Sequence, residues 1–187
     1  AMESRGLGDV YKRQLLYKFM KDHKVHTSEL IINHHQEFVD LVSECYDFHQ
    51  KIFNEDSTWS YAKYNFFSLA APSPLARDLF DELRTLIPSD GKWMQCWINR
   101  HMSDEVLDWH NHDWDYHGYI CIDPKETRTS FWDYSIVNEI GNIYIGPGHR
   151  QHKVCVDEEF DTPRLTLGFD ITTHTAPPNE MLSLIPL

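Results

Sequence analysis

The 187-residue chain has few cysteines and no long apolar segment. Its four cysteines, Cys45, Cys96, Cys121 and Cys155, lie far apart and form no Cys-x-x-Cys pair, so they lack the spacing of a zinc module or a small disulfide scaffold. We interpret them as reduced thiols and expect a cytoplasmic protein. Because no run of about 18 apolar residues occurs, and no signal-peptide apolar segment stands near the N-terminus, the sequence predicts no membrane-spanning or secretory segment.

Basic residues are also scarce. The chain has 17 Lys and Arg against 29 Asp and Glu, a formal net charge of −12. Non-specific nucleic-acid binding depends on Lys and Arg that neutralise phosphates, so this balance gives no signal for it. We expect a small-molecule or peptide substrate as the partner, because an acidic protein attracts cationic groups more readily than DNA. The sequence indicates no particular oligomeric state.

The N-terminal segment does not read like the rest of the chain. Residues 3–14, "ESRGLGDVYKRQ", resemble translated adapter read-through from assembled metagenomic reads. We therefore expect residues 1–14 to be a non-native leader. Residues 15–187 have the length of one domain, which we divide into a helical part over residues 15–90 and a β core over residues 91–175.

Two amphipathic helices are predicted in the helical part. Apolar residues recur every three or four positions from about Thr27 to Ile52, which is the period of a helix with one buried face. A second helix is predicted from Ser73 to Leu86, where Ser73 can cap the first turn and Pro74 suits the first helical position. Such helices usually cover a sheet.

The β core contains short strands separated by turn residues. Seven short strands after two helices predict an α+β protein that is mainly β, a double-stranded β-helix (jelly roll, cupin-like) covered by the N-terminal helices. The candidate strands are residues 93–102, 106–112, 117–122, 129–133, 142–145, 152–156 and 164–171.

Histidines are concentrated in the segment "WHNHDWDYHGY", residues 109–119. In a strand, His110 and His112 would point the same way and Asn111 the other way, which is a spacing that can chelate a metal ion. Imidazole suits iron, zinc, copper or nickel. The alternative is a pair of ordinary exposed or hydrogen-bonded histidines.

A second histidine motif follows a Pro-Gly turn in "GNIYIGPGHRQHKVCV", residues 141–156. Such a turn brings consecutive strands together, so His152 can complete a metal site with His110 and His112. His149 is the alternative ligand, but it lies within the turn and would be held less firmly.

A third motif, "TPRLTLGFDIT", places Arg164 and Thr166 on one face of a strand whose other face is apolar. A guanidinium inside a barrel needs an anionic partner, and its shape suits a carboxylate. The alternative is a surface ion pair with the acidic residues 158–161.

Together, these motifs resemble the jelly-roll core of the iron(II)/2-oxoglutarate-dependent oxygenases, in particular a short phage and marine-bacterial group. The resemblance covers residues 93–172 and includes the earlier run Trp97-Ile98-Asn99 and Gly118. It implies hydroxylation or another oxidation of a substrate C–H bond, with iron(II) as the metal and 2-oxoglutarate as the co-substrate. His110 and His152 would bind iron, whereas Arg164, Thr166 and Asn99 would bind 2-oxoglutarate.

The sequence departs from the family pattern at the third ligand. The family has His-x-Asp or His-x-Glu, but the residue two after His110 is His112. His112 can replace the carboxylate, Asp113 or Asp115 can approach from a bulged strand end, or His110 and His152 can bind the metal alone.

Two other functions fit the same motifs. The run from Gly141 to His152 also resembles the second cupin motif, and His110-x-His112 the start of the first, although the expected glutamate is missing and His117 stands near its place. The protein would then be a small metal-binding cupin: a three-His dioxygenase, an isomerase or a ligand-binding domain. The third hypothesis is a structural jelly roll without catalysis.

Overall fold

The computed structural model describes residues 23–53, 64–174 and 183–187. Within these ranges the chain forms four helices and nine strands. The helices are α2 (Glu29–Asn33), α3 (His35–Phe53), α4 (Phe66–Leu69) and α5 (Pro74–Leu86). The strands are β1 (Lys24–Thr27), β2 (Trp93–His101), β3 (Tyr116–Asp123), β4 (Thr127–Phe131), β5 (Ser135–Val137), β6 (Asn142–Pro147), β7 (His152–Val156), β8 (Arg164–Thr172) and β9 (Ile185–Pro186).

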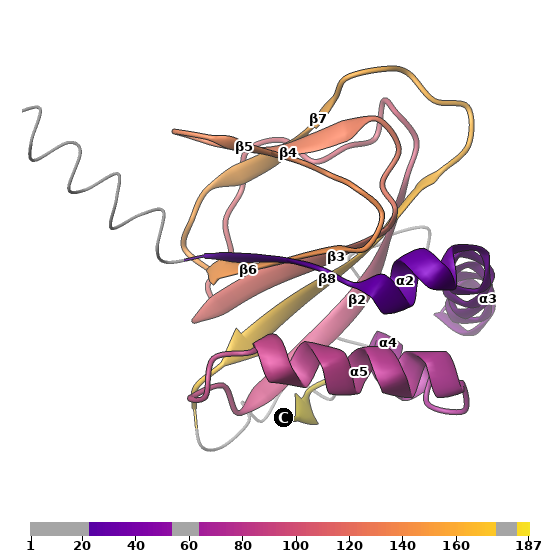
Figure 1. Ribbon diagram of the computed structural model, residues 1–187, viewed down its shortest axis with the longest axis vertical. Coiled ribbons are helices and arrows are strands. Elements are labelled where there is room, and N and C mark those ends of the chain that lie inside the picture. The colour runs from indigo at the N-terminus through magenta and orange to yellow at the C-terminus, as the bar shows by residue number, and fades with distance from the viewer. Residues whose placement is uncertain (1–22, 54–63, 175–182) are drawn as a thin grey trace, which may run out of the picture.

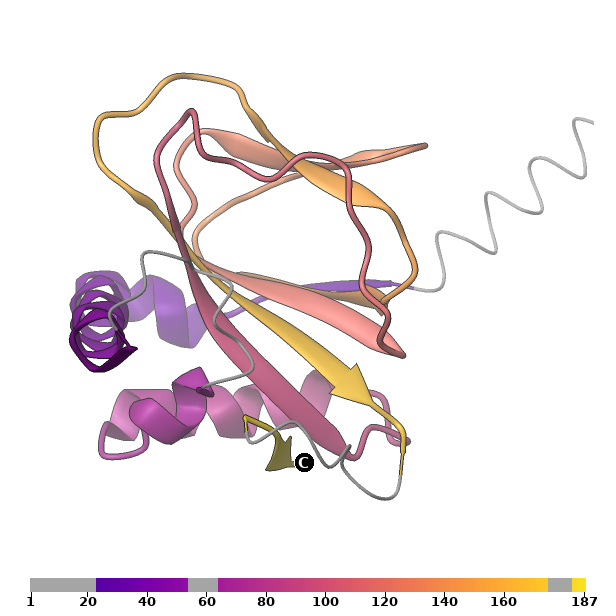
Figure 2. The same cartoon turned by 180° about the vertical axis from the view of Figure 1, so that it is seen from behind.

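The strands form two antiparallel sheets that face each other. The larger sheet has the order β1-β6-β3-β8-β2-β9 and the smaller one β5-β4-β7. The smaller sheet lies over one face of the larger sheet, and α4 and α5 lie against the opposite face of the larger sheet (Figure 1). The view from behind shows the same layers (Figure 2). The predicted fold, a jelly roll flanked by helices, is confirmed.

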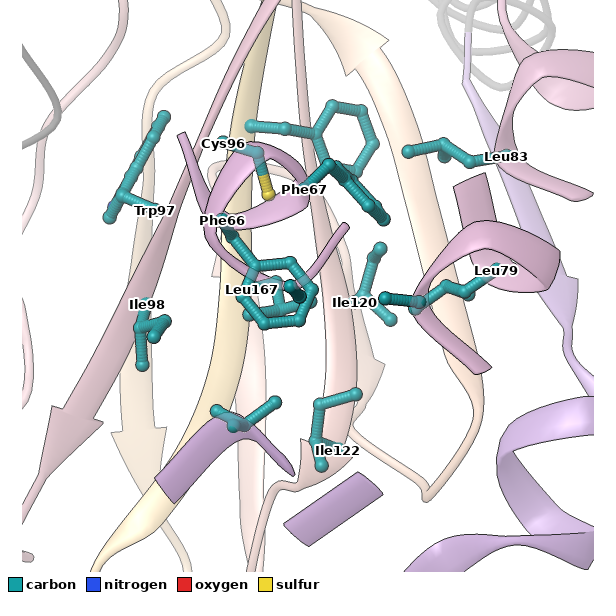
Figure 3. Close-up of a cluster of buried hydrophobic side chains, with 14 of the residues drawn as sticks. Phe66, Phe67, Leu79, Leu83, Cys96, Trp97, Ile98, Ile120, Ile122 and Leu167 are labelled. Carbon is teal, nitrogen blue, oxygen red and sulfur yellow. The ribbon is translucent and has the colours of Figure 1, made fainter. Parts of the chain in front are cut away.

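The main core lies between the larger sheet and the helices. Alternate residues of its three central strands, such as Ile98, Ile120 and Leu167, point toward Phe66 of α4 and Leu79 of α5 (Figure 3). Each of these side chains is fully buried. Because side chains alternate along a strand, the intervening residues of β2, β3 and β8 point toward the smaller sheet, and these carry the polar groups of the predicted site.

The first predicted helix spans about the predicted residues but is not continuous. It is divided into α2 and α3 at His34, and residues 24–27 before it form β1, which pairs with β6. Ser28 caps α2 by accepting a hydrogen bond from the backbone N–H of Ile31 at 3.3 Å. The helical period continues across the break, so apolar spacing did not reveal it. The second predicted helix is confirmed as α5, with Ser73 as its N-cap and Pro74 at its start.

One predicted strand is absent. Residues 106–112 form an irregular segment with a single isolated bridge, between His110 and His152. Its backbone bonds join Leu107 to Val154, His110 to His152 and His112 to Gly148. The register changes from each of these pairs to the next, so no regular ladder forms. The other six predicted strands are confirmed, whereas β1, β5 and β9 were not predicted.

The predicted leader, residues 1–14, lies outside the described residues, and the single domain over residues 15–187 stays a prediction. Within the described ranges, no helix has both the length and the apolar character needed to cross a bilayer.

We expect Leu79→Ala to lower the free energy of unfolding by about 2–5 kcal/mol, because it would leave a cavity between α5 and the larger sheet. Urea unfolding followed by circular dichroism measures this change. Asp78→Ala is the matched control, since Asp78 is exposed on the same helix. Equal losses in the two variants would contradict this packing.

Candidate metal centre

The predicted site residues surround one cavity between the two sheets. Its walls come from β2, β3, β4, β7, β8 and the irregular segment before β3. The lining residues are Trp97, Asn99, Leu107, His110, His112, His117, Tyr119, Thr129, His152, Val154, Arg164, Thr166 and Gly168. All six residues to which the sequence assigned a role therefore line the same cavity.

Three histidines meet at one wall of this cavity. His110 and His152 exchange two backbone hydrogen bonds of 3.0 and 2.9 Å, and the backbone N–H of His112 donates to Gly148 at 3.0 Å. Gly148 is required here, because an added Cβ would lie 2.0 Å from the carbonyl oxygen of Trp114. One ring nitrogen from each histidine lies within 4.8 Å of the other two. The predicted set is thus brought together, although the segment carrying His110 and His112 is not a strand.

The hydrogen bonds of the rings determine which nitrogen is available. His110 Nδ1 lies 2.7 Å from the carbonyl oxygen of Asp108, and His152 Nδ1 lies 3.1 Å from that of Arg150. A carbonyl oxygen only accepts, so both Nδ1 atoms must carry the proton. In a neutral imidazole the lone pair is then on Nε2, which is the atom that can bind a metal.

Burial keeps these imidazoles neutral. Desolvation lowers the pKa of His152 to about 2, with a further contribution from His117 and His110. Desolvation also lowers the pKa of His110. Neutral imidazoles with oriented Nδ1–H groups are the donor set that a first-row divalent metal requires, so these residues fit such an ion.

A buried carboxylate that was not predicted from the sequence lies against His112 and His117. Asp170 is 2% exposed and lies 2.9 Å from His117 Nδ1 and 3.1 Å from His112 Nδ1. Burial alone would raise the pKa of Asp170, but hydrogen bonds from His112 and His117 lower it to about 2. His112, His117 and Asp170 also lie close enough to hold a metal as a group. The signal in the sequence was strand alternation, since Asp170 shares a face with Arg164 and Thr166.

The two aspartates considered as a third ligand lie elsewhere. Asp113 is exposed, and Asp115 accepts hydrogen bonds from the backbone of Thr173 at 2.7 Å and from Thr172 Oγ1 at 3.1 Å. His149, the alternative to His152, is exposed in its turn. Neither of the two ligand groups includes any of them.

Arg164 is buried on the same cavity, with 3% of its surface exposed. It donates to Thr127 Oγ1 at 3.4 Å and to Thr166 Oγ1 at 3.3 Å, both long hydrogen bonds. Asn99 also donates to Thr166 Oγ1, at 3.4 Å. Within residues 23–53, 64–174 and 183–187, no ion pair to Arg164 is formed, so the alternative pairing with residues 158–161 is absent. Desolvation lowers the pKa of Arg164.

Neither a protein-family model nor a curated protein matches the sequence. Solved structures of similar fold include IDO from Bacillus thuringiensis, which is 10% identical with a TM-score of 0.50 over 83% of this chain and 95% of that one. A non-haem monooxygenase, the ThoJ-Ni complex, is 10% identical with a TM-score of 0.50 over 90% of this chain and 78% of that one. A 2OG-Fe(II) oxygenase family protein from Burkholderia pseudomallei is 14% identical with a TM-score of 0.41 over 55% of this chain and 58% of that one. At these identities the similarity to the first two structures, each with a TM-score of 0.50, shows the fold alone.

We expect the metal-free protein to lose stability as the pH falls from about 6.5 to 4. Desolvation lowers the pKa of both His101 and His117 from 6.5 to about 4. Between these values the unfolded chain binds a proton at each residue that the folded chain does not, so the stability present above pH 6.5 is lost on acidification. Each imidazole contributes about 1.4 kcal/mol per pH unit. Urea unfolding at a series of pH values measures the slope.

The variant His101→Asn should reduce the slope of unfolding free energy against pH by about 1.4 kcal/mol per pH unit, because one proton fewer is taken up on unfolding. His174→Asn, at an exposed position, should leave it unchanged. An identical slope in the wild type and in His101→Asn would contradict the prediction.

Proposed function

We propose that the protein is an iron(II)- and 2-oxoglutarate-dependent oxygenase that oxidises a C–H bond of a small-molecule or peptide substrate. One observation carries the proposal: the same cavity is lined by three histidines with oriented rings and by a buried guanidinium. A buried cation is costly unless an anion pairs with it. Since the described residues provide Arg164 with no carboxylate, an anionic ligand is the group that suits it.

The proposed roles follow from the positions of the side chains. His110, His112 and His152 would hold the iron through Nε2, and iron with 2-oxoglutarate supplies the oxidising chemistry. Arg164 would bind the distal carboxylate of 2-oxoglutarate, with a further hydrogen bond from the hydroxyl of Thr166. Asn99 donates to that hydroxyl and accepts from Trp97 Nε1 at 3.0 Å, so it would orient Thr166.

The substrate would approach beside His110. Trp109, the residue before it, stacks on Trp132 with ring centroids 4.7 Å apart, and Trp132 is 72% exposed. This pair offers an apolar surface near the candidate metal site, which suits a small molecule or a peptide side chain. We also propose a cytoplasmic location, because Cys45, Cys96, Cys121 and Cys155 are all free thiols.

A small three-His cupin is the second candidate function. It is favoured by His112, which stands in the ligand group where the oxygenase pattern has a carboxylate. The two candidates differ in Arg164, because only the 2-oxoglutarate enzyme needs this guanidinium.

We expect the iron-loaded protein to convert 2-oxoglutarate slowly to succinate, and Arg164→Ala to weaken 2-oxoglutarate binding at least tenfold by removing a charge-assisted hydrogen bond. Calorimetry measures binding, and chromatography measures succinate. Arg128→Ala is the matched control, because Arg128 pairs with Asp157 outside the cavity. Binding that is unaffected by Arg164→Ala would leave the cupin as the better assignment.

We further expect His110→Ala and His152→Ala each to abolish stoichiometric iron or nickel binding, because two imidazoles then remain in the ligand group. Elemental analysis after dialysis measures the metal content. His149→Ala should bind metal like the wild type, since His149 is outside both ligand groups. Unchanged metal content in His110→Ala and His152→Ala would contradict this ligand group, and a wild-type protein that binds no metal would argue for the structural jelly roll.

A further inference from the structure

Asp170 connects three neighbouring parts of the fold at a single buried carboxylate. In the β8 register it stands opposite Gln95 of β2 on one side and His117 of β3 on the other. Gln95 Nε2 donates to Asp170 Oδ2 at 3.1 Å, and His117 Nδ1 lies 2.9 Å from Oδ1. The third contact, His112 Nδ1 to Oδ2 at 3.2 Å, comes from the irregular segment before β3.

This contact ties the ring of His112 to the sheet. Residues 106–112 form no strand, so neither regular pairing nor side-chain alternation determines where the His112 ring points. Asp170, in contrast, is held on both sides by strands. Asp170 accepts a hydrogen bond from Gln95 Nε2 and lies within hydrogen-bond distance of both imidazole Nδ1 atoms, and a carboxylate only accepts hydrogen bonds. His112 must therefore donate from Nδ1, which leaves the lone pair on Nε2.

We propose that Asp170 is a positioning residue for the metal site. It sets the tautomer and orientation of His112, and it places a negative charge at Nδ1 of that ring, on the side opposite Nε2. This inference rests on the proposed function. The oxygenase pattern has a carboxylate as the third ligand, whereas here the charge lies behind the histidine that replaces it. Carboxylates that accept from the second nitrogen of a ligand histidine typically strengthen metal binding 10–100-fold.

His117 supports Asp170 in this arrangement and lies outside the ligand group of His110, His112 and His152. Its Nδ1 is used by Asp170, and its ring stacks on that of His112 with centroids 3.7 Å apart and an interplanar angle of 12°. The competing arrangement places the metal within the group His112, His117 and Asp170, and the experiment below distinguishes the two.

The first measurement uses the metal-free wild-type protein. Nitrogen-15 NMR of the imidazole rings should show His112 protonated on Nδ1 and unprotonated on Nε2. A His112 ring protonated on Nε2 would overturn the proposal. This result does not depend on 2-oxoglutarate or on turnover, so it separates the inference from the proposed function.

The second measurement is cobalt(II) affinity, determined by competition with a chelator and by the visible spectrum of the bound ion. The amide of Asp170→Asn has a single acceptor oxygen for two imidazole N–H groups, so one ring must change its tautomer or lose its partner. We expect the Kd to rise 10–100-fold in this variant. Asp115→Asn is the matched control and should bind cobalt(II) like the wild type, because the Asp115 carboxylate accepts from Thr172 and Thr173 at the end of β8 and belongs to neither ligand group.

The variant His117→Gln decides between the two ligand groups. If His117 only supports Asp170, cobalt(II) binding should remain within about threefold of wild type, because His112 keeps its carboxylate. Loss of binding in His117→Gln, with binding retained in His110→Ala and His152→Ala, would overturn the proposal in favour of the competing group. An unchanged Kd in folded Asp170→Asn would overturn it as well, even if wild-type protein turns over 2-oxoglutarate. No cobalt(II) binding by wild-type protein would count against both the proposed function and this inference.

Discussion

Side-chain alternation along β8 is the constraint on which both the core and the site depend. This strand is paired on both sides and all nine of its residues are buried, so no side chain can be directed to solvent. Leu165, Leu167, Phe169 and Ile171 enter the helix-facing core. Arg164, Thr166 and Asp170 must then enter the space between the sheets, where each needs a partner of its own. A single strand thus determines both the packing of α4 and α5 and the polarity of the cavity.

The same burial explains the electrostatics of the cavity. Desolvation lowers the pKa of His110, His117 and His152, which keeps the rings neutral and their lone pairs available. Their remaining N–H groups are bound by carbonyl oxygens or by Asp170, so the rings are oriented before any ligand binds. Preorganised donors of this kind lose little conformational entropy when a metal binds. Burial therefore favours metal binding here, because it keeps the imidazoles neutral while their hydrogen bonds keep them oriented.

The sequence was sufficient to predict the parts of the structure that follow a simple period. The apolar and polar alternation of residues 164–171 placed Arg164 and Thr166 on one face, and Ser73-Pro74 located the start of α5. The helix break at His34 and the irregular course of residues 106–112 could not be predicted, because both depend on contacts with distant segments. His110 and His112 still reach the predicted cavity, since backbone bonds to His152 and Gly148 replace the expected ladder. Asp170 lay on the predicted polar face, but only the register of three strands shows that it meets His112.

The position of the two buried charges on β8 accounts for their separate roles. Asp170 and Arg164 are six residues apart on the same face, a separation of about 20 Å at 3.3 Å per residue. At that distance they cannot form an ion pair, so neither charge satisfies the other. Asp170 is stabilised by two imidazoles and an amide from within the protein. Among the described residues, Arg164 forms only long hydrogen bonds, to two threonine hydroxyls. The carboxylate therefore stabilises the histidine end of the cavity, whereas the guanidinium end is completed best by an anion from outside the described residues.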